Sequence, residues 1–196
     1  MKSQLDLLCR FIQPFGILFT PKEVEIIKSH SKIIHVPAHT ILMEQGKTVK
    51  KLYFLFDGIV RLFREENHVD YTLGMTSLPF FLSTPIHILN NQISTCSLES
   101  LTEVELMEWN KADVLELKKQ IPNMYDLELI IMDLLLRWLQ DNQINAICMN
   151  AEEQYIHLMK TQPRIIQQIP QKYIASLLGI HQDSLSRIRK NIALKN

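Results

Sequence analysis

The stretch from Ile169 to Lys190, IPQKYIASLLGIHQDSLSRIRK, constrains the fold of this 196-residue chain more than any other stretch. Apolar residues recur at helical spacing on both sides of Gly179, which predicts two short helices joined by a tight turn. A glycine can take the left-handed backbone conformation that ends a first helix. Ala175, four residues earlier, is small enough for the two helices to cross closely. These features make a helix-turn-helix pattern, whose second helix spans about Gln182–Lys190.

The charge of the chain is divided unevenly. The 21 Lys and Arg residues balance the 21 Asp and Glu residues, so the formal net charge is zero. Residues 171–196 contain five of the basic residues and one acidic residue, so they carry +4 and residues 1–170 carry −4. A positive segment that coincides with a helix-turn-helix predicts binding to a polyanion. The alternative, a helical hairpin whose charges are only solvated, is disfavoured because spacing, glycine and basic residues all agree.

The cysteine pattern indicates reduced thiols. Cys9, Cys96 and Cys148 are far apart and form no CxxC pair, which disfavours disulfides, zinc sites and iron–sulfur clusters. We therefore expect no metal and no other cofactor. The N-terminus shows no signal-peptide pattern, and the longest apolar run, residues 127–139, is interrupted by charges and too short to span a bilayer. These observations predict a cytoplasmic protein.

The N-terminal part of the chain changes from helical to strand periodicity near Lys32. Helices are expected at Ser3–Ile12 and after Thr20, where Thr20 and Glu23 form a capping box. Beyond Lys32 the apolar residues alternate, and Asp57-Gly58 between two apolar runs is a strong hairpin signal. Further strands are expected at 69–75, 93–101 and 103–109, ahead of a helix at 111–120. Short strands separated by turns predict an antiparallel barrel or roll.

Residues 122–149 form one long helix in this interpretation, with apolar residues around nearly its whole circumference. A helix that is apolar on all sides must be covered on all sides. A roll of this size covers one side, so we expect a second copy of the helix on the other side, which makes a homodimer. The alternative is a helix buried within its own chain. The expected seam residues are Leu127, Ile131, Leu134 and Trp138.

The order of these elements resembles the CRP/FNR superfamily of bacterial transcription regulators. The resemblance rests on GKTVKKLYFLFDGIVRLF at 46–63, which is similar to the central hairpin of the family's roll, and on the helix-turn-helix at 169–190. It implies an α+β fold with an N-terminal antiparallel β-roll, a jelly roll like that of cyclic-nucleotide-binding domains. A long dimerisation helix and a C-terminal helical helix-turn-helix domain would follow. The expected domains are residues 1–120 for the effector domain, 121–150 for the dimerisation helix and 151–196 for the DNA-binding domain.

The region that corresponds to the family's phosphate cassette departs from the family pattern. Cyclic-nucleotide-binding members have a Gly-Glu pair and a later Arg there, which hold the ribose hydroxyl and the cyclic phosphate. Here residues 74–98 contain no Arg, Lys, Asp or Glu, although a buried phosphate needs a cation or a helix N-terminus. We therefore expect no useful binding of cyclic AMP.

Two interpretations of this uncharged region stay open. Either the pocket is sealed by Phe80, Phe81 and Leu82, or it holds an uncharged small-molecule effector. The candidate lining residues are Met75, Phe80, Phe81, His87, Ser94 and Thr95.

The second helix of the helix-turn-helix supplies the candidate DNA contacts. By the resemblance, the base-reading positions fall on Gln182, Asp183 and Arg187, whose side chains can pair with adenine, cytosine and guanine. Arg187 is the first candidate among them. The remaining members of the expected DNA-contacting set, mostly suited to phosphates, are Ser186, Lys190, His181, Ser184, Arg189 and Lys172. Only six residues follow Lys190, so we expect the flanking β-wing of many family members to be reduced or absent.

The leading interpretation is a sequence-specific DNA-binding transcription regulator, which binds a near-palindromic operator in double-stranded DNA as a two-fold dimer. Contacts with RNA polymerase stay open. The alternative is a β-roll sensor or interaction module that no longer binds DNA specifically, in which substitution of Arg187 changes nothing measurable. An enzyme is disfavoured, because the sequence has no Gly-rich phosphate loop, nucleophile elbow or metal-binding constellation.

Overall fold

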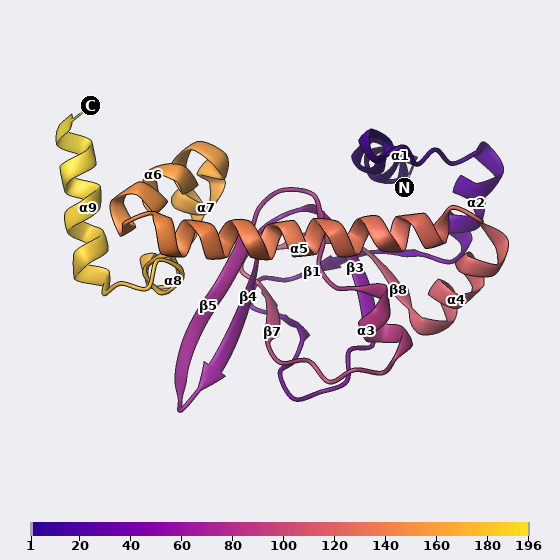
Figure 1. The fold of residues 1–196 in the computed structure, drawn as a ribbon, viewed down its shortest axis with the longest axis horizontal. Helices are drawn as coiled ribbons and strands as arrows, with labels where there is room; N and C mark the ends of the chain where they lie inside the picture. The colour runs from indigo at the N-terminus through magenta and orange to yellow at the C-terminus, as the bar shows by residue number, and fades with distance from the viewer. Residues whose placement is uncertain (1, 196) are drawn as a thin grey trace.

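Two antiparallel sheets pack face to face in the computed structural model, which describes residues 2–195 (Figure 1). The first sheet has the order β1 (Lys32–Val36), β8 (Val104–Asn110), β3 (Lys51–Asp57) and β6 (Phe80–Phe81). The second has the order β2 (Ile41–Met43), β7 (Ser97–Ser100), β4 (Val60–Glu66) and β5 (Val69–Thr76). The predicted antiparallel roll is thus confirmed. β7 is shorter than the expected strand at 93–101, because Ser94 instead pairs with the loop at Gly46, whose N–H donates to the Ser94 carbonyl at 2.8 Å.

Strand β3 is buried on both faces, as its unbroken apolar sequence predicts. Leu52, Phe54 and Phe56 join a core shared with helices, whereas Tyr53 and Leu55 lie between the two sheets. The helices that cover this outer face of the first sheet are α1 (Lys2–Ile12), α2 (Pro21–Ser29), α4 (Lys111–Gln120) and the first half of α5 (Met124–Cys148). Full burial of one side chain such as Phe54 stabilises the fold by about 1.5–3 kcal/mol.

Capping side chains start several helices where the sequence predicts them. The Glu23 N–H donates to the Thr20 hydroxyl at 3.3 Å, and the Thr20 N–H donates to the Glu23 carboxylate at 2.7 Å. The Thr20 N–H and the Thr20 hydroxyl, which also donates to this carboxylate at 2.8 Å, lower the pKa of Glu23. Asn110 and Asn150 start the helices that begin at Lys111 and Ala151 with the same reciprocal arrangement. α5 begins at Met124, two residues after its expected start, because the intervening residues form a turn.

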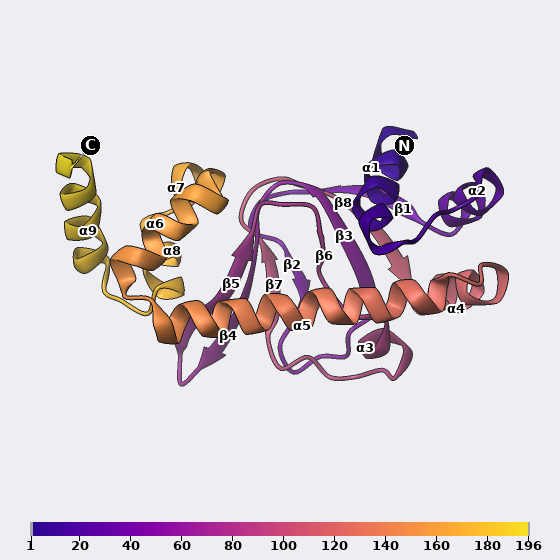
Figure 2. The same ribbon diagram turned by 45° about the horizontal axis from the view of Figure 1, so that its top comes forward.

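A head of four helices follows α5 and comprises residues 151–195. Its helices are α6 (Ala151–Thr161), α7 (Pro163–Gln168), α8 (Gln171–Leu177) and α9 (Gln182–Lys195). Figure 2 shows α5 running along the molecule from the roll to the head. The described residues of the head, 151–195, contain no strand. The short helices η1 (Gln13–Phe15) and α3 (Pro85–Leu89) complete the described elements of the roll. None of the helices in residues 2–195 is long and apolar enough to cross a membrane.

The apolar circumference of α5 is divided between the roll and solvent. Leu127 and Ile131 are only 5% and 2% exposed, because they pack into the core of their own chain. Leu134 is half-buried, and Trp138 packs against Gly74 of β5. The predicted seam was therefore wrong at Leu127 and Ile131, and Trp138 faces the roll as well. A different set of apolar residues on α5 is exposed: Tyr125, Leu129, Leu136, Leu139, Ile144 and Ile147.

Candidate nucleic-acid interface and effector pocket

The turn between α8 and α9 has the predicted backbone geometry. Gly179 has a φ of +65°, which lies in the left-handed region that side chains with a Cβ avoid. The Ile180 N–H donates to the Ala175 carbonyl at 3.0 Å and closes the end of α8. Ala175 itself is 2% exposed and lies in the core of the head. The helix-turn-helix predicted from residues 169–190 is therefore present.

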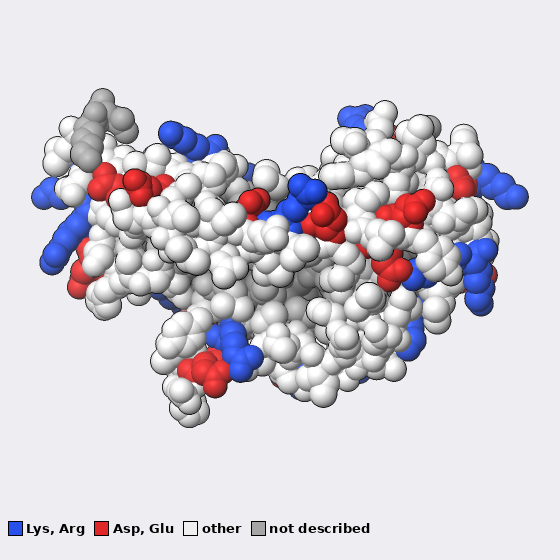
Figure 3. All heavy atoms as spheres, viewed as in Figure 1, with Lys and Arg blue, Asp and Glu red and all other residues white. Residues whose placement is uncertain are grey.

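Helix α9 presents one uniformly exposed polar face to solvent. Leu185 is fully buried and Ile192 nearly so, so both point into the head. Arg187 lies on the opposite, exposed side of the helix. Figure 3 shows Lys and Arg side chains along this outer side of α9. The residues that share the exposed face at helical spacing are Gln182, Asp183, Ser186, Arg187 and Lys190.

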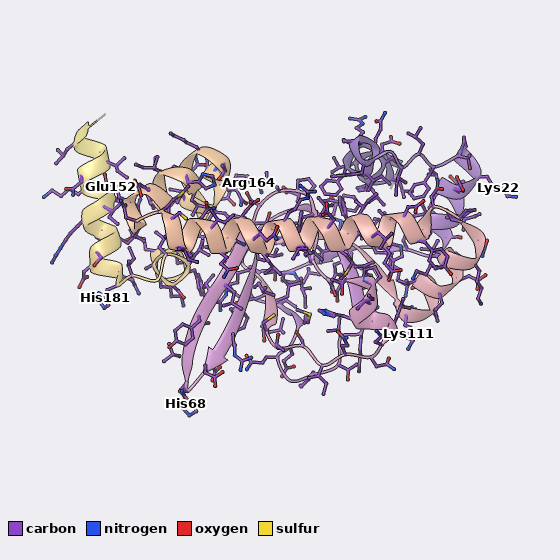
Figure 4. The ribbon with its side chains drawn as sticks, viewed as in Figure 1. Lys22, His68, Lys111, Glu152, Arg164 and His181 are labelled. Carbon is purple, nitrogen blue, oxygen red and sulfur yellow. The ribbon has the colours of Figure 1, made fainter. Side chains whose placement is uncertain are left out.

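The remaining predicted contact residues surround that face less uniformly. His181 lies just before α9, where its Nδ1 is 3.3 Å from an Asp183 carboxylate oxygen (Figure 4). Ser184 is exposed on the first turn, whereas Arg189 is half-buried. Lys172 lies on α8 rather than α9, and its Nζ is 4.6 Å from the centre of the Tyr173 ring. Eight of the nine predicted residues thus lie on α9 or directly before it, and Lys172 lies on α8.

A small apolar cavity lies between the roll and α5, at the place where the sequence predicts the effector pocket. Its volume is about 60 Å³. Three of the candidate pocket residues, Met75, Phe80 and Phe81, line it. Its lining contains no charged side chain. The lining residues that the sequence analysis missed are Val60, Leu62, Gly74, Thr76, Leu98, Leu135 and Trp138, together with Leu82, which was expected to seal the pocket.

Three predicted pocket residues lie elsewhere, and their assignment is corrected. His87 is half-buried on α3, where burial lowers the pKa of its imidazole. The Ser94 hydroxyl donates to the Cys96 carbonyl at 2.6 Å within a turn. Thr95 is exposed, and its carbonyl accepts a hydrogen bond from Arg64 at 2.7 Å. These residues lie close to the pocket in sequence, but α3 and the following turn carry them away from it.

The sequence analysis also missed a charge cluster around a buried arginine on the outer face of the second sheet. Arg61 of β4 is only 4% exposed. Its guanidinium donates to both carboxylate oxygens of Asp70 at 2.6 Å and to Glu99 at 2.7 Å. Burial opposes the charge of Arg61, but the bonds to Asp70 and Glu99 outweigh burial and raise its pKa. The position of Arg61 in the β4 sequence gave no signal of these partners, which lie on β5 and β7.

The roll, the long helix and the all-helical head together have the fold of several solved regulators, among them a transcriptional regulator of the crp/fnr family from Eubacterium rectale. No protein-family model and no curated protein sequence matches the chain.

Three solved structures illustrate this likeness in fold. The c-di-GMP-responsive global regulator CLP of Xanthomonas campestris is 17% identical with a TM-score of 0.68, over 90% of this chain and 93% of that chain. FixK2 of Bradyrhizobium japonicum is 10% identical with a TM-score of 0.71, over 84% and 85% of the two chains. The catabolite activator protein of Thermus thermophilus is 22% identical with a TM-score of 0.53, over 90% and 85%. At these identities the likeness is one of fold.

Proposed function

We propose that this chain is a sequence-specific DNA-binding transcription regulator of CRP/FNR type that acts as a dimer and does not respond to cyclic AMP. One observation carries the proposal: α9 buries Leu185 in the head and leaves the face around Arg187 free for the major groove. The fold shared with known regulators supports the class. The specificity and the lack of a cyclic AMP response are inferred from this chain's own residues.

Base recognition is assigned to three residues of the exposed face of α9. Arg187 can donate two hydrogen bonds to guanine, Gln182 can pair with adenine, and Asp183 can accept from cytosine. In the free protein the Nδ1 of His181 lies 3.3 Å from a carboxylate oxygen of Asp183. His181, Ser184, Lys190, Arg189 and Lys172 would contact phosphates, which gives affinity and salt dependence rather than sequence preference.

The dimer is proposed to form through the exposed apolar face of α5. Leu129, Leu136 and Leu139 are 69%, 54% and 55% exposed, and their spacing of seven and three residues is that of a coiled-coil seam. Met132 and Gln143 occupy further positions of the same three- and four-residue spacing. This face replaces the seam predicted from the sequence. Two-fold pairing of α5 would place two α9 helices in successive major grooves, about 34 Å apart.

The lack of a cyclic AMP response is inferred from the cavity between the roll and α5. The lining offers no cation to a phosphate, and a buried phosphate without a partner is costly. Its volume of about 60 Å³ is also far below the several hundred Å³ of a typical ligand pocket. The large apolar side chains of Trp138 and Phe81 are among the lining residues.

The test is selection from a random duplex pool, followed by a salt titration of the selected duplex with and without cyclic AMP. Wild-type protein should select a near-palindromic sequence, and Arg187→Ala should lose about 1–3 kcal/mol of binding and relax one base pair per half-site. Arg10→Ala removes the same charge from an exposed position on α1 and is the matched control. Cyclic AMP should leave every affinity unchanged. Two results would contradict the proposal. One is weak binding by the wild type that does not depend on sequence, and the other is an unchanged consensus for Arg187→Ala.

A further inference from the structure

Helix α8, the first helix of the helix-turn-helix, lies against β5 at the edge of the second sheet. The Thr72 N–H of β5 donates to the Ser176 hydroxyl of α8 at 2.9 Å, and that hydroxyl donates to the Asp70 carbonyl at 3.3 Å. An edge strand has unpaired backbone groups, and Ser176 satisfies two of them as a neighbouring strand would. The head is therefore joined to the roll by its DNA-binding motif itself.

The aromatic ring of Tyr173 covers the buried Arg61 from the head side. The guanidinium carbon of Arg61 is 4.3 Å from the centre of the Tyr173 ring and 4.1 Å from the centre of the Phe63 ring. The cation thus lies between one ring of the roll and one ring of the head. Because Asp70 and Glu99 fix the guanidinium in its plane, the ring of Tyr173 has one favourable position over it.

Two further contacts join the roll to a different part of the head. Arg164 of α7 donates to the Asp57 carboxylate at 2.6 Å (Figure 4). The side-chain carbonyl of Gln162 accepts the Ser77 N–H at 2.7 Å. Ile59, Met75 and Leu101 of the roll also share a core cluster with the apolar residues of the head. Contacts at both α7 and α8 oppose rotation of the head in a way that a single contact would not.

The geometry points to a latch, formed by Arg61, Asp70 and Thr72 of the roll with Tyr173 and Ser176 of α8, that holds the head in one orientation and thereby positions α9 for DNA. This inference rests on the proposed function. Arg61 is a positioning residue in it, because it acts on α9 only through Tyr173 and α8. The latch leaves the exposed face of α9 uncovered, so the head is held ready for DNA rather than hidden from it.

A fixed head makes a specific prediction about operator geometry. If each α9 is held on its own roll, the two copies in a dimer have a fixed separation and a fixed rotational phase. The dimer should then reject operators whose half-sites are moved apart in single base-pair steps, up to about half a helical turn, roughly 5 base pairs. A head on a flexible tether would tolerate such changes. If these residues only stabilised the fold, their substitution would not change how binding affinity depends on half-site spacing.

The experiment compares wild type, Tyr173→Leu, Ser176→Ala and Tyr173→Phe on the operator selected by the wild type and on its spacing variants. Tyr173→Leu and Ser176→Ala should reduce the penalty for altered spacing by about tenfold. Tyr173→Phe keeps a ring over Arg61 and should keep the wild-type profile. Affinity for an isolated half-site should be the same for all four proteins, because α9 is untouched. Ser176→Ala removes only one hydroxyl, so it provides the test if Tyr173→Leu fails to fold.

A second measurement does not need DNA. Nitrogen-15 relaxation of the full chain should show the head and the roll tumbling together in the wild type and in Tyr173→Phe. The head should gain independent motion in Tyr173→Leu and Ser176→Ala. Independent tumbling in the wild type, or an unchanged spacing profile in both released variants, would overturn the latch. Absence of any sequence-specific binding by the wild type would instead overturn the proposed function, and the relaxation data would still decide the latch.

Discussion

Gly74 shows how one missing side chain can decide how two elements pack. A Cβ at Gly74 would lie 2.3 Å from two ring carbons of Trp138, closer than any real contact allows. The absence of a Cβ at Gly74 is what lets the indole of Trp138 approach the strand so closely. The contact closes one side of the apolar cavity, because both residues belong to its lining.

We expect Gly74→Ala to destabilise the protein by about 1–3 kcal/mol, because the Trp138 ring must move out of a packed site. Trp138→Phe in the same chain should recover part of that loss, since the smaller ring leaves room for the methyl group. Urea unfolding of the two single variants and the double variant measures the coupling. Purely additive losses would show that the two residues do not meet as the structure places them.

At the scale of elements, the turn between α8 and α9 fixes the angle at which α9 leaves the head. Gly179 has no neighbouring atom within 4 Å of the position where a Cβ would lie. Any cost of substitution there comes from the backbone conformation alone, because a side chain meets nothing. The turn therefore isolates backbone strain from packing.

Gly179→Ala should cost about 1–2 kcal/mol, the cost of a left-handed conformation for a residue with a Cβ. Gly179→Asn should cost less, because asparagine tolerates this conformation better. Denaturant unfolding with matched slopes would measure both. Equal stability of Gly179→Ala and the wild type would mean that the turn can relax into another conformation.

At the scale of the whole molecule, α5 carries the roll on one face and leaves a second apolar face uncovered. Leu127 and Ile131 belong to the first face, and Leu136 belongs to the second. A two-fold dimer through the second face would combine with the latch to fix both α9 helices. Binding to a near-palindromic operator needs both conditions together.

Leu136→Asp should convert the dimer to monomers at micromolar concentration, because it places two charges in an apolar seam. The control is Leu115→Asp on α4, where the leucine is also exposed, at 42% against 54% for Leu136. Sedimentation equilibrium compares the two with the wild type. A dimer that persists in Leu136→Asp would show that another surface pairs the chains.

The sequence by itself determined the features that depend on neighbours along the chain. Capping boxes such as Thr20 with Glu23, the left-handed Gly179 and the two-sided burial of β3 are all local patterns, and the structure has each of them. Each needs only the period and chemistry of a few consecutive residues. This is why the order of the elements and the helix-turn-helix could be predicted.

The tertiary structure alone decided which surfaces meet. Thr72 and Ser176 are 104 residues apart in the chain, and no pattern in the sequence pairs them or places Tyr173 over Arg61. The apolar residues of α5 surround the helix, so the sequence does not indicate which face of α5 packs on the roll. Helical periodicity states that a face exists, whereas only packing of the complete chain decides what covers it.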